Sequence, residues 1–301
     1  MKVLLTGARG HIGRHCLKQL LIKGYEVHAV SSMQQPNTTG VQWHQVNLLD
    51  TYEAKTLIRA VKPSHLLHFA WYTEHGKYWT AEENLNWIHA SFALMNEFVA
   101  SNGKRFVAAG TCAEYDWSKE LCSEVTTACR PATLYGASKY STHLLLEAWA
   151  RQIGLSSAWG RIFMLYGPGE YSLRLVPSVI NSLLCGEPAL CTHGKQVRDF
   201  MYVEDVAAGF IALLESDVKG VVNIASGVGV PLKALVYNIA NQLGRRDLVK
   251  LGAIPTSANE PAKLIADVGR LRDEVGFKPS YNLENGISLT IESIKKVINA
   301  G

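Results

Sequence analysis

Tyr135 and Lys139 have the side-chain types and the spacing to move a proton. Residues four apart lie on the same face of a helix, so the phenol and the ammonium would be neighbours. A phenol has an ordinary pKa of about 10, and a nearby positive charge lowers that pKa by stabilising the phenolate. Tyr135 is therefore predicted to give a proton to a carbonyl that is being reduced, or to take one from an alcohol that is being oxidised.

A tyrosine and a lysine four residues apart also occur by chance, so the pair indicates catalysis only if the surrounding elements place it at a binding site. The first half of the chain alternates short apolar runs with helical patterns, which is typical of βαβ units and a parallel sheet. Strands are expected at residues 2–6, 26–30, 41–46, 65–70, 105–110 and 156–162, and helices at residues 11–23, 52–61, 81–101 and 132–152. The second half is less regular, with strands expected near residues 200–203 and 221–224 and a final helix near residues 285–298.

We therefore predict an α/β fold. Residues 1–165 would form a Rossmann-type doubly wound parallel sheet, with return segments near residues 200–226, and residues 166–301 would mainly form a smaller C-terminal substrate-binding lobe. The Tyr–Lys helix would follow the fifth strand. Thr111, at the end of that strand, lies where open parallel sheets place their ligands, although its hydroxyl could instead cap a turn.

The first strand and the first helix are joined by Thr6-Gly7-Ala8-Arg9-Gly10-His11-Ile12-Gly13. Glycines at this spacing let the chain turn sharply, let backbone N–H groups approach a pyrophosphate, and let the helix pack closely on the strand. The helix N-terminus adds positive partial charge. A nicotinamide dinucleotide is therefore expected here. Its predicted contacts are Gly7, Arg9, Gly10, His11, Ile12, Gly13, Ser31, Ser32, Asn47, Leu48, Phe69, Ala70, Trp71, Tyr135 and Lys139.

The end of the second strand indicates which dinucleotide binds. An acidic residue there would hold the ribose 2′-hydroxyl of NAD, but this chain has Ser31 and Ser32 instead. Arg9 in the glycine loop could meet the 2′-phosphate of NADP, or could be a solvated loop residue. NADP(H) is therefore favoured over NAD(H).

The bulk composition excludes several classes of protein. The chain has 301 residues, 48% of them hydrophobic and 19% charged, which is ordinary for a soluble globular protein. A net charge of +4 without a basic run argues against a nucleic-acid partner. No apolar stretch approaches the roughly 20 residues of a membrane span, and the N-terminal one is too short for a signal peptide. The six cysteines form no CxxC pair and no metal-ligand spacing, so we expect free thiols, no metal and a cytoplasmic protein.

These motifs together resemble the extended short-chain dehydrogenase/reductases, and more narrowly the NAD-dependent epimerase/dehydratase group that acts on nucleotide sugars. Further matches are Arg161-Ile162-Phe163, Tyr166-Gly167-Pro168-Gly169, Arg198-Asp199-Phe200-Met201-Tyr202-Val203-Glu204-Asp205-Val206, Ala266-Asp267 and Gly276-Phe277-Lys278-Pro279. The resemblance implies a catalytic triad of Thr111, Tyr135 and Lys139. It also implies a homodimer, formed through the helices at residues 81–101 and 132–152.

Substrate contacts are expected at Thr73, Cys112, Glu114, Arg174 and Arg198. By resemblance, Arg198 would bind the substrate diphosphate, although it could instead pair with Asp199. Glu114 could equally be a solvated charge. The aromatic segment 69–79 could form a substrate wall or anchor its loop to the core.

Departures from the family pattern narrow the reaction. Family 4,6-dehydratases carry Asp-Glu directly after the threonine, where this chain has Cys112 and Ala113. The 3,5-epimerase-reductases use a Cys and a His, and the resemblance places Ala113 and Arg174 at those positions in this chain. Met164 and Trp87 replace two asparagines common in the group. We therefore expect an NADPH-dependent reductase of a nucleotide-activated 4-keto-6-deoxy sugar, with two alternatives: a nucleotide-sugar 4-epimerase with tightly bound NAD, or a non-catalytic NADP(H)-binding regulator.

Overall fold

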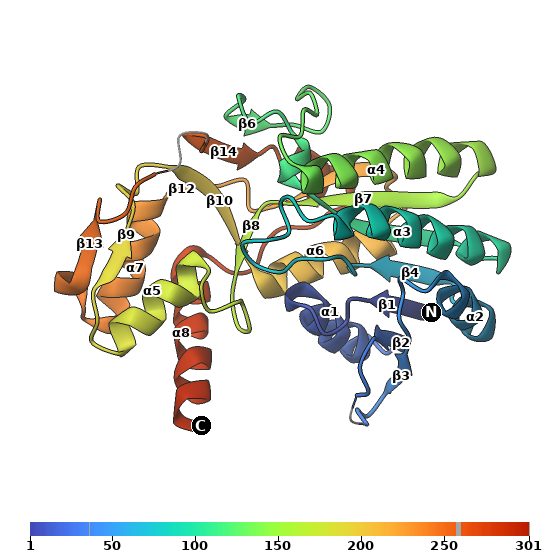
Figure 1. Cartoon of the computed structure of the whole chain (residues 1–301), viewed down its shortest axis with the longest axis horizontal. Helices are drawn as coiled ribbons and strands as arrows, with labels where there is room; N and C mark the ends of the chain where they lie inside the picture. The colour runs from blue at the N-terminus through green and yellow to red at the C-terminus, as the bar shows by residue number, and fades with distance from the viewer. Residues whose placement is uncertain (36, 257–259, 301) are drawn as a thin grey trace.

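A parallel sheet of seven strands forms the larger lobe of the molecule (Figure 1). The computed structural model describes residues 1–35, 37–256 and 260–300. In spatial order the strands are β11 (Gly220–Ile224), β7 (Ser156–Ile162), β5 (Arg105–Thr111), β4 (His65–His68), β1 (Lys2–Thr6), β2 (Glu26–Ser31) and β3 (Val41–Gln45). All neighbours are parallel. The strand order changes direction between β1 and β4, and such a point in an open parallel sheet forms a ligand crevice.

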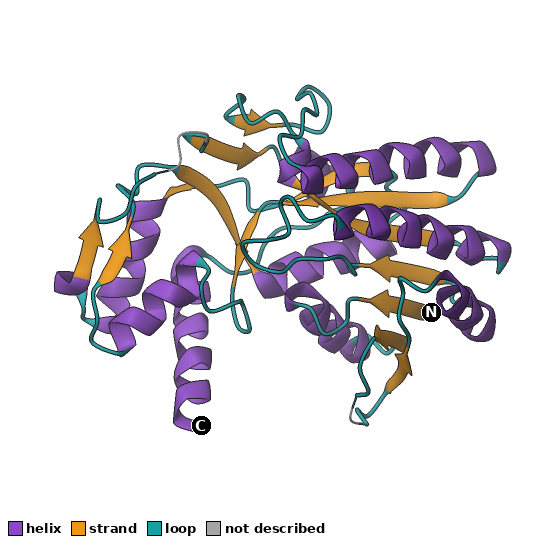
Figure 2. Cartoon of the chain, viewed as in Figure 1, coloured by secondary structure: helices purple, strands orange, loops and turns teal. Residues whose placement is uncertain are grey.

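Helices cover both faces of this sheet (Figure 2). One face carries α1 (His11–Ile22) and α6 (Val203–Glu215), and the other carries α2 (Thr51–Val61), α3 (Glu83–Ala100) and α4 (Leu134–Ile153). Neighbouring side chains of β1 serve opposite faces, because Cβ atoms alternate along a strand. Leu5 packs on the α1–α6 side and Leu4 on the other, and both are fully buried. The predicted doubly wound parallel sheet is confirmed.

The smaller lobe is built from short strands and three helices. A mixed sheet contains β12 (Gly229–Pro231), β10 (Val197–Tyr202), β14 (Lys263–Ala266), β6 (Leu121–Cys122) and β8 (Met164–Tyr166). Beside it lie β9 (Ala189–Cys191), β13 (Val249–Leu251), α5 (Leu175–Leu184), α7 (Leu232–Leu243) and α8 (Leu283–Ala300). Ile180, Leu235 and Ile287 from these helices share one buried apolar cluster.

The chain passes repeatedly between the two lobes. Only Phe163 separates β7 of the large sheet from β8 of the small one. After β10 the chain returns through α6 to β11, one of the two edge strands of the large sheet. The strand expected at residues 200–203 therefore begins three residues earlier, at Val197, and belongs to the small sheet. None of the described helices is long and apolar enough to span a membrane.

Candidate active site

A cavity of about 1100 Å³ lies between the lobes, at the carboxyl ends of the large sheet. It brings together every predicted site residue except Glu114. The residues that line it as predicted are Gly7, Arg9, Gly10, His11, Ile12, Gly13, Ser31, Ser32, Asn47, Leu48, Phe69, Ala70, Trp71, Thr73, Thr111, Cys112, Tyr135, Lys139, Arg174 and Arg198. Their individual roles remain predictions.

The glycine loop has the shape that a dinucleotide needs. Gly7 has φ of +66°, in the left-handed region that favours glycine, and an added Cβ would lie 2.8 Å from the backbone nitrogen of Ala70. A Cβ at Gly13 would overlap the carbonyl oxygen of Gly7, so the helix start can approach β1 this closely only with glycine. The backbone hydrogen bonds of α1 begin with the one from Arg14 N–H to Gly10 O, at 3.2 Å. The N–H groups of the first turn are thus available to a phosphate, and the residues present fit the cofactor.

Ser31 and Ser32 line the cavity, and so does Arg9 of the glycine loop. Among the described residues that line the cavity, the carboxylates are Glu170 and Glu260. Neither follows β2, where an acid would hold a ribose 2′-hydroxyl. The structure therefore keeps the feature on which the prediction of NADP(H) rests.

Tyr135 is held by the start of α4. Thr133 caps this helix by accepting a hydrogen bond from Gly136 N–H at 3.1 Å, and the Tyr135 N–H donates to Trp79 O at 3.1 Å. The Tyr135 ring meets Tyr78 edge to face, with centroids 4.9 Å apart. Burial raises the pKa of Tyr135 above its ordinary value, Tyr78 adds to this, and a hydrogen bond with Thr111 opposes it. This is opposite to the lowering that the sequence predicts, and it keeps the phenol protonated and able to donate.

Lys139 explains the difference, because its ammonium faces elsewhere. Its Nζ donates to Ala109 O at 2.8 Å and lies 3.8 Å from the centre of the Trp71 ring. Burial lowers the Lys139 pKa to about 7. Trp71 is itself fixed by a 2.8 Å hydrogen bond from its Nε1 to Asn84 Oδ1. The aromatic segment after β4 thus both anchors its loop and lines the cavity.

Thr111 combines its predicted role with the turn-capping alternative. It is the N-cap of a short 3-10 helix, η1 (Cys112–Glu114), and its Oγ1 accepts a hydrogen bond from Ala113 N–H at 3.2 Å. Its side chain also lines the cavity beside Tyr135. The hydroxyl is therefore held in place by the backbone that follows β5.

Glu114 is not among the described residues that line the cavity, so nothing in the structure supports the predicted contact with substrate, and its burial rules out the alternative of a solvated charge. The residue is fully buried. One carboxylate oxygen accepts from Thr111 N–H and from Trp159 Nε1, both at 2.9 Å, and the other accepts from Arg161 Nε at 2.7 Å. With both oxygens occupied, Glu114 is a positioning residue for Thr111.

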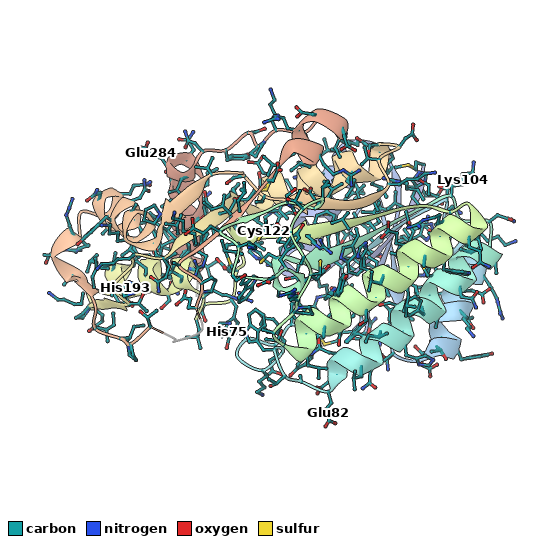
Figure 3. The ribbon with its side chains drawn as sticks, turned by 90° about the horizontal axis from the view of Figure 1, so that it is seen from above. His75, Glu82, Lys104, Cys122, His193 and Glu284 are labelled. Atoms are coloured by element: carbon teal, nitrogen blue, oxygen red, sulfur yellow. The ribbon has the colours of Figure 1, made fainter. Side chains whose placement is uncertain are left out.

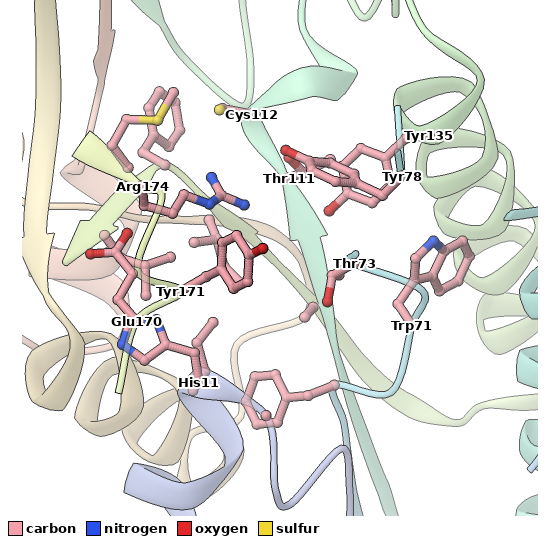
Figure 4. A pocket seen from close by; sticks show the side chains of 18 of the residues that line it. His11, Trp71, Thr73, Tyr78, Thr111, Cys112, Tyr135, Glu170, Tyr171 and Arg174 are labelled. Atoms are coloured by element: carbon pink, nitrogen blue, oxygen red, sulfur yellow. The ribbon is translucent and has the colours of Figure 1, made fainter. Parts of the chain in front are cut away.

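Arg174 and Glu170 are ionisable residues on the side of the cavity opposite Tyr135 (Figure 4). The Arg174 guanidinium extends towards Thr111 and Tyr78, 5.9 Å from the Tyr78 ring centre. Burial raises the pKa of Glu170 to about 8, and its Oε2 has no hydrogen-bond partner among the described residues. The sequence prediction missed Glu170, although its place directly after Gly167-Pro168-Gly169 could have indicated it.

Arg198 pairs with a residue that the sequence did not single out. Its Nη2 lies 2.8 Å from Glu260 Oε1. Asp199, the alternative partner, accepts hydrogen bonds from the N–H groups of Ser226 at 2.9 Å and Gly227 at 2.9 Å. The short sequence distance from Arg198 to Asp199 was therefore a poor guide, and Glu260 joins the cavity lining.

The arrangement can support hydride transfer at a carbon that bears oxygen. The hydroxyls of Tyr135 and Thr111 lie next to each other in the cavity. The glycine loop, at the carboxyl end of β1, lines the same cavity. A neutral phenol can protonate an alkoxide as it forms. The remaining cavity, which reaches α5, β9 and β10 in the small lobe, leaves room for a substrate longer than the reacting group.

A model of the NAD dependent epimerase/dehydratase family matches residues 3–225. The dTDP-glucose 4,6-dehydratase of Salmonella typhimurium is 25% identical, covering 97% of this chain and 92% of that protein. A UDP-glucose 4-epimerase of Rhizobium meliloti is 24% identical, covering 93% of each. A dTDP-4-dehydro-6-deoxyglucose reductase of Escherichia coli is 22% identical, covering 97% of each.

Solved structures share the whole fold. The UDP-glucose 4-epimerase of Thermotoga maritima, with UDP-glucose, has a TM-score of 0.89 at 24% identity, covering 99% of this chain and 100% of that one. MoeE5, in complex with UDP-glucuronic acid and NAD, has a TM-score of 0.87 at 27% identity, with the same coverage. The small lobe is therefore part of the shared architecture.

Proposed function

We propose a reaction for this chain, which belongs to the NAD dependent epimerase/dehydratase family: hydride transfer at one carbon of a nucleotide sugar, with Tyr135 moving the accompanying proton. The observation that carries the proposal is the meeting of Tyr135, Thr111 and the glycine loop in one cavity. A bound nicotinamide dinucleotide supplies or accepts the hydride.

Each residue has a defined task in this proposal. Thr111 donates a hydrogen bond to the sugar oxygen and orients it. Tyr135, whose pKa burial raises, holds the proton for that oxygen during reduction. In the oxidative direction Tyr135 must accept a proton, which the positive nicotinamide ring of the oxidised cofactor favours. Lys139 binds the cofactor ribose, after its ammonium leaves the carbonyl of Ala109.

The first candidate reaction is 4-epimerisation. It oxidises the C4 hydroxyl of the sugar, turns the ketone in the cavity, and reduces it from the other face. Epimerases predominate among the proteins to which this chain is similar, including UDP-glucose and UDP-glucuronate 4-epimerases. Cys112 and Ala113, which follow Thr111, provide no carboxylate for dehydration. The comparisons therefore favour the epimerase over the reductase that the sequence placed first.

The second candidate is NADPH-dependent reduction of a nucleotide-linked 4-keto-6-deoxy sugar. Two observations favour it: the serines at the end of β2, and Arg9 in the glycine loop, all of which line the cavity. A net reductase consumes its cofactor and would draw on NADPH, whereas an epimerase regenerates the one it holds. The similarity to the Escherichia coli reductase agrees with this reaction.

One experiment separates the candidates. The purified chain is given each of a panel of nucleotide sugars and their 4-keto-6-deoxy forms, with NAD or NADPH, and products are identified by NMR. Epimerisation gives a C4 epimer with no net change in cofactor oxidation, and reduction consumes one NADPH per product. Cofactor binding without hydride transfer to any substrate, unchanged in Tyr135→Phe, would leave only a non-catalytic regulator.

We further propose that the chain forms a homodimer through α3 and α4. These helices lie side by side along the outside of the large lobe, with Glu82 just before the start of α3 (Figure 3). Leu85, Leu144 and Leu145 are 52%, 45% and 56% exposed there. A second copy related by a two-fold axis would cover this apolar surface.

A further inference from the structure

We propose that Glu260 sets the strength and selectivity of diphosphate binding, because its carboxylate competes with the substrate for the guanidinium of Arg198. This inference rests on the proposed nucleotide-sugar function, since it requires a diphosphate in the cavity. Glu260 is then a specificity-determining residue, because the substrate must displace its carboxylate before it can bind the guanidinium of Arg198.

The competing contact is short and lies in the cavity wall. Arg198 Nη2 is 2.8 Å from Glu260 Oε1, and Arg198 Nη1 donates to the carbonyl oxygen of Val197 at 2.8 Å. Both charged residues line the cavity. The Glu260 carboxylate therefore neutralises the charge of Arg198 and occupies N–H groups of the guanidinium that a phosphate oxygen would otherwise bind.

Glu260 is held from a second side. Gln196 Nε2 donates to Glu260 Oε2 at 3.0 Å and to Thr192 Oγ1 at 3.3 Å. Gln196 is 3% exposed and also lines the cavity. The amide thus fixes the carboxylate in the orientation that meets Arg198.

The two partners differ in their freedom to move. The side chain of Arg198 is 6% exposed and that of Glu260 is 29% exposed. When a diphosphate enters, the arginine stays, and the glutamate gives up its hydrogen bond with Gln196 and turns outwards to water. A diphosphate that stayed beside Glu260 would meet a like charge, which is strongly unfavourable at short range. A neutral polar group could bind without this displacement, so Glu260 weakens the binding of diphosphates relative to nucleosides.

The test compares Glu260→Gln with wild type, each saturated with its cofactor. Glutamine keeps the size and a hydrogen-bonding oxygen but removes the competing charge. Binding of UDP, dTDP and GDP, and of the matching nucleosides, is measured by calorimetry. We expect about tenfold tighter binding of the preferred diphosphate and little change for its nucleoside. With the active substrate, KM should fall while kcat at saturation stays unchanged.

Two further variants make the result specific. Glu120→Gln removes a carboxylate that pairs with Lys263 at 2.8 Å but does not line the cavity, so it should leave diphosphate binding unchanged. Adding Arg198→Gln to Glu260→Gln should abolish the gain. Circular dichroism and thermal unfolding verify that each variant is folded.

The outcomes are distinguishable from failure of the proposed reaction. Equal or weaker diphosphate binding by folded Glu260→Gln overturns the inference, and so does a lack of diphosphate binding by both proteins, even if hydride transfer to another substrate is found. Tighter binding without any hydride transfer would support the role of Glu260 and contradict the proposed reaction.

Discussion

The carboxylate of Glu114 and the guanidinium of Arg161 form an ion pair beneath the cavity, with Oε2 2.7 Å from Nε and side-chain exposures of 0% and 3%. The other oxygen of Glu114 holds the backbone N–H of Thr111 at 2.9 Å. The end of β5 is therefore connected to β7 through one charged side chain. The placement of the Thr111 hydroxyl depends on this buried pair.

Replacing Glu114 with alanine should destabilise the fold by about 3–5 kcal/mol, because it leaves the Arg161 charge buried without its partner. The change in free energy of unfolding is measured by urea denaturation. Loss of the exposed pair between Glu120 and Lys263, in Glu120→Ala, is the control and should change stability by less than about 1 kcal/mol. Equal losses in the free energy of unfolding for the two variants would show that the buried pair stabilises the fold no more than the exposed pair does.

Tyr135→Phe should lower kcat by about 10²- to 10⁴-fold, because the variant lacks the proton that the phenol carries. Binding of cofactor and nucleotide sugar should remain close to wild type, since the ring still packs against Tyr78. Single-turnover measurement of hydride transfer checks the first point and equilibrium binding the second. A variant that retains full activity would remove Tyr135 from the mechanism.

The fold of the large lobe was predictable because its signals are local. Buried parallel strands form continuous apolar runs, and the glycine loop identifies the first βα turn. The small lobe gives no comparable signal, since strands as short as Leu121–Cys122 and Lys263–Ala266 have too few residues for a period. They are defined by pairing between segments far apart in the chain.

Ser31→Asp should shift cofactor preference towards NADH, because a carboxylate at the end of β2 can hold a ribose 2′-hydroxyl and repels a 2′-phosphate. Arg9→Ala should weaken NADPH binding about tenfold and NADH binding much less, through loss of a hydrogen-bonded charge. Fluorescence titration of wild type and of each variant with NADH and with NADPH measures the affinities. Equal wild-type affinities for NADH and NADPH, unaffected by Arg9→Ala, would contradict the preference.

Lys139 should make stability rise with pH. Burial lowers its pKa from 10.5 to about 7 in the folded protein, so between these values the unfolded chain binds more protons and the folded state gains stability as pH increases. The stabilisation is complete above pH 10.5 and is lost as pH falls through about 7. Lys139→Met should remove this slope from urea-unfolding free energies measured across that range.

The exposed Lys104 provides the matched control, since Lys104→Met should leave the slope unchanged. Glu170 acts in the opposite direction, because burial raises its pKa from 4.5 to about 8 and its contribution to stability is lost as pH rises through about 8. Burial also raises the pKa of Cys16, Cys112 and Cys122, and these thiols lower stability as pH rises in the alkaline range. The contribution of Lys139 is therefore the difference between wild type and Lys139→Met at each pH. An unchanged slope in Lys139→Met would show that this lysine is not held in the low-pKa environment.

Leu145→Glu should convert the proposed dimer to a monomer, because it places a charge in the apolar surface shared by α3 and α4. Light scattering after size-exclusion chromatography gives the mass of each species. Ile22→Glu on α1 is the control, since Ile22 is 76% exposed away from this surface and should leave the mass unchanged. A wild-type monomer at all concentrations would exclude the dimer.

The active site was predictable where a residue belongs to a local motif or matches the family pattern. Thr111, Tyr135 and Arg174 reach the cavity as expected. The burial of Glu114 was not predictable, because its sequence neighbours do not reveal its partner Arg161, which lies on β7. Glu260 was missed because its partner Arg198 is 62 residues away, and only the folded chain brings the two charges together.

The passage of the chain through Phe163 into the small lobe, and its return through α6 to β11, restricts how such an enzyme can acquire a new substrate. Val206, Phe210 and Ile224 come after this excursion, yet they complete the apolar cluster that contains Leu5 and Val107. A genetic recombination that exchanged everything after residue 165 would therefore replace part of the cofactor-binding core as well. New specificity must arise by substitutions within the lobe, at positions such as Glu260, rather than by transplanting it as a cassette.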